Sequence, residues 1–111
     1  PALTDMKAMF DSCRNLESVD MTGFDTARVT DMSNLFSGCS SLREADLSSF
    51  DTAKVQSMYA MFYGCGGLTS LDISGFTSRN LQRTSKMFTG VGHLETFACT
   101  DDVIMKAYRT R

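Results

Sequence analysis

The sequence repeats with a period of 26 residues and without an insertion, and this period constrains the fold more than any other feature. The most regular column of the repeat holds Phe10, Phe36, Phe62 and Phe88. The copies span residues 3–28, 29–54, 55–80 and 81–100, and the last copy is eroded at its end. A fixed period in this range is typical of stacked units, none of which can cover its own apolar face. We therefore predict about four stacked repeats.

With 111 residues the chain is long enough to bury the core of one domain, which we expect to span residues 1–111. Residues 101–111 do not follow the repeat and are predicted to fold over its last copy as a cap. The first copy shows no such cap, which suggests further repeats upstream in a parent protein, or an abutting partner. No apolar run approaches 18 residues, so we expect no membrane insertion by this segment.

One half of each repeat has helical spacing. In the second copy the apolar residues are spaced 3, 3, 1 and 3 apart, at Val29, Met32, Leu35, Phe36 and Cys39. This is one stripe of a short helix, with Thr30 as its N-cap and Gly38 as a left-handed residue at its C-terminal end. Such a helix has about two turns and depends on packing for its stability.

The other half of each repeat alternates apolar and polar residues, as in Leu42-x-x-Ala45-x-Leu47. This alternation predicts a short strand with one buried face. An Asp-Thr pair after Phe24 or Phe50 then signals a turn before the next copy. Each repeat is therefore read as strand, turn, short helix and turn.

Two motifs carry a family resemblance. L-x-x-L-x-L is similar to the strand signature of leucine-rich repeats. The longer pattern is F-D-T-A-[RK]-V, then M-x-x-[LM]-F-x-G-C-x-x-L and x-D-[LMI]-[ST]-x-F. It resembles the BspA-like leucine-rich repeats of bacterial surface proteins and mycoplasma-type lipoproteins. The resemblance covers residues 3 to about 100 and weakens at residues 81–90.

The resemblance and the repeat together define the expected fold and location. We predict an α/β fold, a right-handed leucine-rich-repeat-like solenoid with one short parallel sheet and short helices on the opposite side. The resemblance implies a cell-surface or extracellular location and a role in adhesion or another protein contact.

The outward face of the predicted sheet holds the main candidates for a binding surface. An acidic column comprises Asp20, Asp46 and Asp72, and a neighbouring polar column comprises Ser18, Glu44 and Ser70. The carboxylates have three possible roles: hydrogen bonding to turn groups or plain solvation, contact with a partner, or binding a hard cation such as calcium. One carboxylate per repeat is sparse for a cation, so we predict no metal site. Tyr59 and Tyr63, four residues apart on the third predicted helix, are a second candidate for partner contact.

Cysteine and histidine offer no catalytic or metal-binding pattern. Cys13, Cys39 and Cys65 form a column whose side chains should point the same way, so we interpret them as buried free thiols. The sequence contains no C-x-x-C pair of the kind that binds zinc. His93 is the only histidine and has no repeated nucleophile beside it. We therefore predict no catalytic residues and no cofactor.

These patterns leave three classes of function. The net charge of −2 argues against a nucleic-acid partner. The first hypothesis is a non-catalytic protein-interaction module of adhesion type, with a protein partner. The second is a structural spacer or accessory subunit that docks through the ends of the solenoid. The third, an enzyme, would need a cleft with convergent titratable groups, whereas the repeat distributes such groups evenly.

Overall fold

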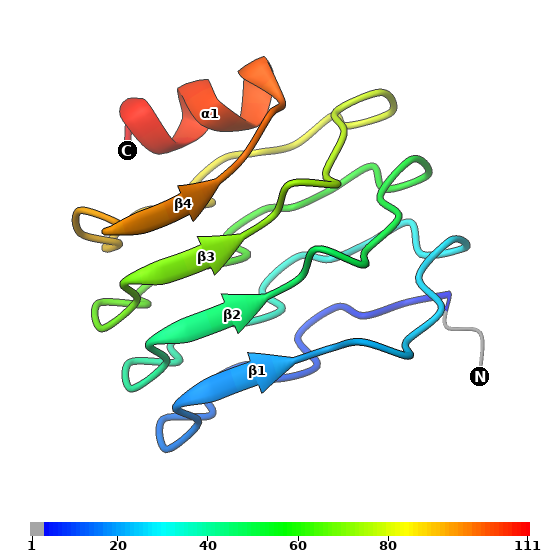
Figure 1. Cartoon of the computed structure of the whole chain (residues 1–111). Coiled ribbons are helices and arrows are strands. Elements are labelled where there is room, and N and C mark those ends of the chain that lie inside the picture. Colours follow the sequence, from blue (N-terminus) through cyan, green and yellow to red (C-terminus); the bar gives the residue numbers. More distant parts are fainter. Residues whose placement is uncertain (1–3) are drawn as a thin grey trace.

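The computed structural model describes residues 4–111 and contains one four-stranded parallel sheet (Figure 1). The strands, in the order in which they pair, are β1 (Ser18–Asp20), β2 (Glu44–Asp46), β3 (Ser70–Asp72) and β4 (Thr96–Ala98). A single short helix, α1 (Asp102–Arg109), follows β4. Leu3, the first residue of the first repeat, lies outside the described residues.

The register of the sheet follows the period of the sequence. Ser18 pairs with Glu44, Glu44 with Ser70, and Ser70 with Thr96, so paired residues are always one repeat apart. Each strand has only three residues, with its central side chain directed to the core and its outer two toward solvent. The predicted four parallel strands are confirmed.

The short helices predicted opposite the sheet are wrong. In residues 4–111 the only helix is α1, and the segment with helical spacing is a pair of β-turns in each repeat. In the second repeat the N–H of Leu35 donates to the carbonyl of Met32 at 3.3 Å, and that of Cys39 to Phe36 at 3.1 Å. The third residues of these turns, Asn34 and Gly38, have φ of 58° and 77°, as type II turns require.

Hydrogen bonding between repeats explains why turns replace helices. The N–H groups of Met32, Asn34, Phe36 and Gly38 donate to carbonyls of the third repeat at 2.7–2.9 Å. A helix of two turns would leave most of its main-chain groups without an internal partner. In the turn segment, every second N–H is paired with the next repeat instead, and the same apolar residues still face inward. The spacing 3, 3, 1, 3 is thus compatible with both structures.

The glycines placed at left-handed positions by the sequence do have positive φ, with 77° for Gly38, 76° for Gly64 and 91° for Gly90. Each is the third residue of a β-turn and does not follow a helix. At Gly90 a Cβ would lie 3.2 Å from the Cα of Gly64, so the column also requires close approach of the two backbones. Positive φ at Lys86 and its equivalents, Ala8, Asn34 and Ala60, was not predicted.

The apolar columns of the sequence are stacks of like side chains in the core. The rings of Phe10, Phe36, Phe62 and Phe88 lie nearly parallel, with neighbouring centroids 5.5–5.8 Å apart. Phe10 is only partly buried because it has a neighbour on one side. Offset stacking of this kind adds to the stabilisation from burial.

The four cysteines are free thiols, as predicted for the cysteine column. The thiols of Cys39 and Cys65 each donate to a phenylalanine carbonyl of the preceding repeat, at 3.1 Å. Burial is the main cause that raises the pKa of Cys65 to about 12. Cys13, in the first repeat, is half-buried.

Helix α1 packs on the last repeat. Asp101 caps it by accepting the N–H of Ile104 at 3.0 Å, and its other oxygen accepts the N–H of Ser78 at 2.8 Å. Burial alone would raise the pKa of Asp101, but these hydrogen bonds outweigh it and lower the pKa. Ile104 is fully buried, and the edge of the Tyr108 ring meets a core ring, Phe88. No described helix is long and apolar enough to cross a membrane.

Phe36→Ala or Phe62→Ala should lower the free energy of unfolding by about 3–5 kcal/mol, because each removes a buried ring with a neighbour on both sides. Phe10→Ala should cost less because that ring is partly exposed. Urea denaturation followed by circular dichroism measures all three. Equal, small losses would contradict the stacked column.

Tyr108→Phe tests the attachment of α1. The Tyr108 hydroxyl accepts the N–H of Leu94 at 2.9 Å and donates to the carbonyl of Gly92 at 3.1 Å. Its removal should cost about 1–2 kcal/mol in the same urea measurement. Tyr63→Phe, which alters an exposed tyrosine, is the control and should have almost no effect. A loss as large in the control would argue against this role of Tyr108.

Candidate functional site

The candidate residues of the sheet lie on its outer face at both ends of each strand. Ser18 and Asp20 bound β1, Glu44 and Asp46 bound β2, and Ser70 and Asp72 bound β3. Of these six residues, the four in β1 and β2 are exposed, and the two in β3 are half-buried. The strands are held in register by main-chain pairing, so these six residues occupy defined positions relative to one another.

Four of these residues line one open depression with a volume of about 290 Å³. They are Glu44, Asp46, Ser70 and Asp72, and the lining is completed by Ala45, Leu71, Thr96 and Ala98. Ser18 and Asp20 are outside it, on the edge strand. The depression lies over β2, β3 and β4, and Ala98 stands where the other repeats have Asp. Register alone would have predicted the participation of Thr96 and Ala98.

Each aspartate of the column is anchored by the turn that follows its strand. One oxygen of Asp20, Asp46 and Asp72 accepts the N–H two residues later, at 3.0, 3.1 and 3.0 Å respectively. Asp46 also accepts the hydroxyl of Ser48 at 2.6 Å, and this bond is the main cause that lowers the pKa of Asp46. Hydrogen bonding to turn groups, one of the three roles considered for this column, is therefore present.

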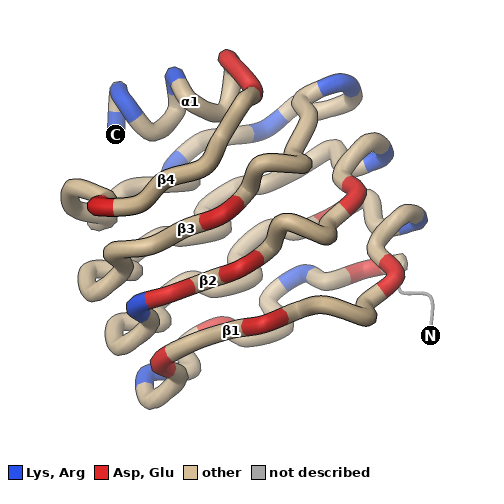
Figure 2. Tube along the Cα trace, in the orientation of Figure 1, with Lys and Arg blue, Asp and Glu red and all other residues tan. Residues whose placement is uncertain are grey.

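The outer face of the sheet carries a continuous run of negative charge. Figure 2 shows acidic residues along β1, β2 and β3, and the pairing places Asp46 between Asp20 and Asp72. Strand spacing puts neighbouring carboxylates about 4.8 Å apart, where like charges repel in the absence of a donor between them. Within residues 4–111 no three His, Cys, Asp or Glu side chains are grouped to hold a metal ion. The surface is suited to accept hydrogen bonds from cationic or amide groups.

Tyr59 and Tyr63 do not lie on a helix as predicted, but they do line a common hollow. Each is the second residue of a turn in the third repeat, and their hollow has a volume of about 150 Å³. The Arg83 guanidinium lies 4.9 Å from the centre of the Tyr59 ring, within the range of a cation–π contact. No sequence motif indicated Arg83, although the register places it in the repeat next to Tyr59.

Ser48→Ala should raise the pKa of Asp46 toward its ordinary value, because the variant loses the hydroxyl bond and keeps the main-chain one. A carboxylate whose pKa is lowered by folding stabilises the fold above its unfolded pKa, and that contribution is lost as pH falls through the folded pKa. Carbon-detected NMR titration of the carboxyl group measures the change, with Ser49→Ala as control. An unchanged titration in Ser48→Ala would contradict the assigned cause.

Comparisons with known proteins identify a family without assigning a function. The family model described as "Mycoplasma protein of unknown function, DUF285" matches residues 3–102, which includes all four strands of the sheet. No curated protein matched the chain, and no solved structure did. The match covers nearly the whole repeat array and ends where α1 begins. The chain therefore belongs to the DUF285 family of mycoplasma proteins of unknown function.

Proposed function

We propose that this chain is a non-catalytic protein-interaction module of adhesion type, from a bacterial surface protein. Its architecture is then a short, leucine-rich-repeat-like solenoid of the BspA-like kind. The repeat motifs and the in-register parallel sheet support the solenoid. The cell-surface location rests on the resemblance to BspA-like repeats.

The observation that carries the proposal is the acidic depression over β2, β3 and β4. Its side chains come from three repeats, so their spacing is set by main-chain hydrogen bonds rather than by flexible loops. A surface fixed in this way binds a partner without the entropic cost of ordering it. The depression is open and shallow, which suits a protein surface better than an enclosed small molecule.

The charge of this face indicates the chemistry of the partner. Asp46 and Asp72 each have one oxygen held by a turn N–H, so the carboxylates are oriented before binding. We expect a partner that presents Lys or Arg, and an association rate that falls as ionic strength rises.

The alternative function is a structural spacer or accessory subunit. It is favoured by the first repeat, where Met9 and Phe24 have exposed fractions of 38% and 40% although equivalent positions in the second repeat are buried. In that case contacts with a neighbour are made by the end of the stack and not by the sheet.

The test removes the charge of the aspartate column without disturbing its turns. In the triple variant Asp20, Asp46, Asp72→Asn, each amide oxygen can still accept the turn N–H. The matched control, Asp5, Asp25, Asp51→Asn, changes three exposed aspartates that accept equivalent bonds away from the sheet. Both variants should keep the circular dichroism spectrum and unfolding midpoint of the wild type.

Immobilised wild-type domain is exposed to solubilised surface proteins of a mycoplasma, and captured proteins are identified by mass spectrometry. We expect a specific protein whose capture is lost in the triple variant, weakened by salt and retained in the control. Equal capture by both variants would place the contact elsewhere. No specific capture would favour the spacer.

A further inference from the structure

The hollow beside the two tyrosines of the third repeat gathers polar side chains that the fold itself does not use. Six residues line it, namely Asn34, Ser37, Tyr59, Ala60, Tyr63 and Lys86. Five of them have polar side chains, and none of these five side chains takes part in a hydrogen bond within residues 4–111. Their donors and acceptors are therefore available to a ligand.

Ser37 gives the clearest sign that the hollow receives a ligand. Only 9% of this residue is exposed, yet its hydroxyl has no hydrogen-bond partner among residues 4–111. No fully enclosed polar side-chain atom of the described residues lacks a partner, so the Ser37 oxygen keeps some access to solvent. The hollow that Ser37 lines provides this access. Because an unpaired, nearly buried hydroxyl is costly, a ligand that bonds to it gains affinity.

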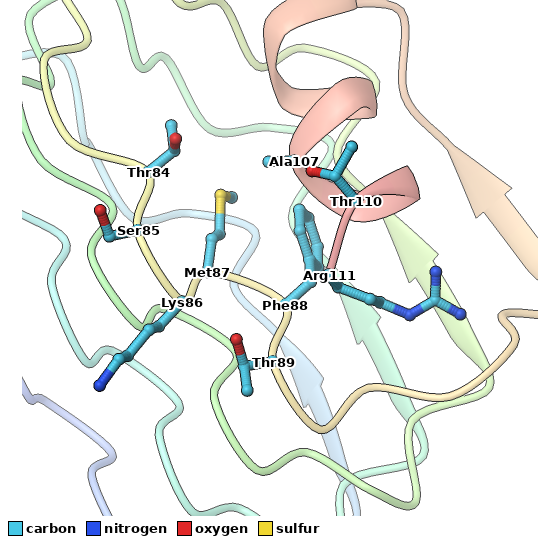
Figure 3. A pocket seen from close by; sticks show the side chains of 9 residues that line it. All are labelled: Thr84, Ser85, Lys86, Met87, Phe88, Thr89, Ala107, Thr110 and Arg111. Atoms are coloured by element: carbon cyan, nitrogen blue, oxygen red, sulfur yellow. The ribbon is translucent and has the colours of Figure 1, made fainter.

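The register of the repeats brings the lining residues together. Asn34, Ala60 and Lys86 are the third residues of equivalent turns, so they follow one another along the stack, with Ala60 in the middle repeat. Tyr59 directly precedes Ala60, and Tyr63 is the second residue of the next turn. Figure 3 shows the Lys86 side chain extending away from α1. The hollow thus combines two aromatic rings of one repeat with an amide from the repeat before and an ammonium group from the repeat after.

We propose that this hollow binds a hexuronic acid unit of a glycan, which is a pyranose ring that carries a carboxylate. The C–H groups of a pyranose face pack on aromatic rings, whose faces carry partial negative charge, and Tyr59 and Tyr63 supply such rings. Sugar hydroxyls both donate and accept hydrogen bonds, as do the side chains of Asn34 and Ser37. The carboxylate would accept a charge-assisted hydrogen bond from Lys86.

The charge around the hollow favours an acidic sugar over a neutral one. None of the six lining residues is acidic, and Lys86 is exposed. The Arg83 guanidinium lies 4.9 Å from the centre of the Tyr59 ring and brings a second positive charge to this side of the stack. The outer face of the sheet is acidic and would repel the same ligand, so the two surfaces select different ligands.

The size of the hollow favours one sugar ring over a longer ligand. Its volume is about 150 Å³, whereas pockets for drug-sized molecules begin at about 300 Å³. A proline-rich segment of a partner protein is the competing occupant, because such segments dock in aromatic-lined grooves. It needs an elongated groove, whereas Tyr59 and Tyr63 share a single hollow.

The test is an NMR titration of the isotope-labelled chain at pH 7 with methyl glucuronide and with methyl galacturonide. The matched probes are the corresponding neutral glycosides, which have CH₂OH in place of the carboxylate, and acetate, which has the carboxylate alone. We expect at least one uronide to shift the ring signals of Tyr59 and Tyr63 and the side-chain amide of Asn34, with a millimolar dissociation constant. Its neutral counterpart should bind several-fold more weakly, and acetate should leave the ring signals unchanged.

Variants at two positions assign the contacts. Tyr63→Ser introduces the residue that the second repeat has at this position, so the fold should tolerate it while uronide affinity falls about tenfold. Tyr63→Phe keeps the ring and should bind nearly as well as the wild type. Lys86→Gln should abolish the preference for the uronide over the neutral glycoside, whereas Lys54→Gln, at an exposed position in the second repeat, should preserve it.

Ser37→Ala tests the nearly buried hydroxyl. It should weaken the uronide and the neutral glycoside by a similar factor, because both sugars offer hydroxyl groups to Ser37. The unfolding midpoint should not fall, since this hydroxyl bonds to no residue among 4–111. Unchanged affinity for both sugars would exclude Ser37 from the site and contradict the proposed geometry.

Several results would overturn the proposal. These are unchanged ring signals of Tyr59 and Tyr63 at tens of millimolar of either uronide, equal affinity for the uronide and its neutral counterpart, or undiminished binding by Tyr63→Ser. Equal shifts with acetate would indicate an anion held by Lys86 alone. Shifts of these signals by an acetylated, amidated polyproline peptide, without binding of either uronide, would assign the hollow to a protein segment. The sheet-face aspartates are intact throughout, so failure here leaves the proposed adhesion surface untouched.

Discussion

The main-chain bonds between turn segments are the interaction on which the rest of the structure depends. In each repeat every second N–H of the turns points to the next repeat, and the first three repeats use four such donors each. These bonds hold the apolar columns in register, so that Phe36 lies on Phe62 and Cys65 reaches the carbonyl of Phe36. Because the strands have only three residues, the sheet alone provides few main-chain hydrogen bonds between repeats. The bonds between turn segments provide the others.

The corner that follows each strand uses the same principle with side chains. Thr26 accepts the N–H of Asp51 at 2.9 Å, and Thr52 that of Thr77 at 2.9 Å, so each buried hydroxyl joins one repeat to the next. After the last repeat, Asp101 accepts the N–H of Ser78 and so joins the N-terminal end of α1 to the third repeat. A buried hydroxyl must find a partner at a fixed distance, and an inserted residue would remove it. This explains why the period is kept at 26 residues throughout.

The sequence allowed prediction of whatever depends on the period, and less of what depends on local conformation. The period gives strand order, register and the outward position of Asp46, because parallel stacking places equivalent residues side by side. It does not distinguish a short helix from two turns, since both bring Met32, Leu35 and Phe36 to one side. The residue types of Ala60 and Lys86 do not indicate a positive φ, whereas glycine at position 64 does. The register places the lining residues of the depression side by side, but no residue pattern indicates the hollow itself.

The bonds between turns all run in one direction, and this makes the two ends of the stack chemically different. Within residues 4–111, the turn carbonyls without a partner lie at the edge of the first repeat, and the turn N–H groups without a partner lie at the edge of the last. The net charge also differs between the two ends, because acidic residues outnumber basic ones in residues 1–78 and basic residues outnumber acidic ones in residues 79–111. Helix α1 covers the apolar side of the last repeat by burying Ile104 against the core. Within residues 4–111 the N–H groups of Lys86 and Gly90 donate to no carbonyl of α1. Helix α1 therefore closes the core of this stack without using the N–H groups at the edge of the fourth repeat.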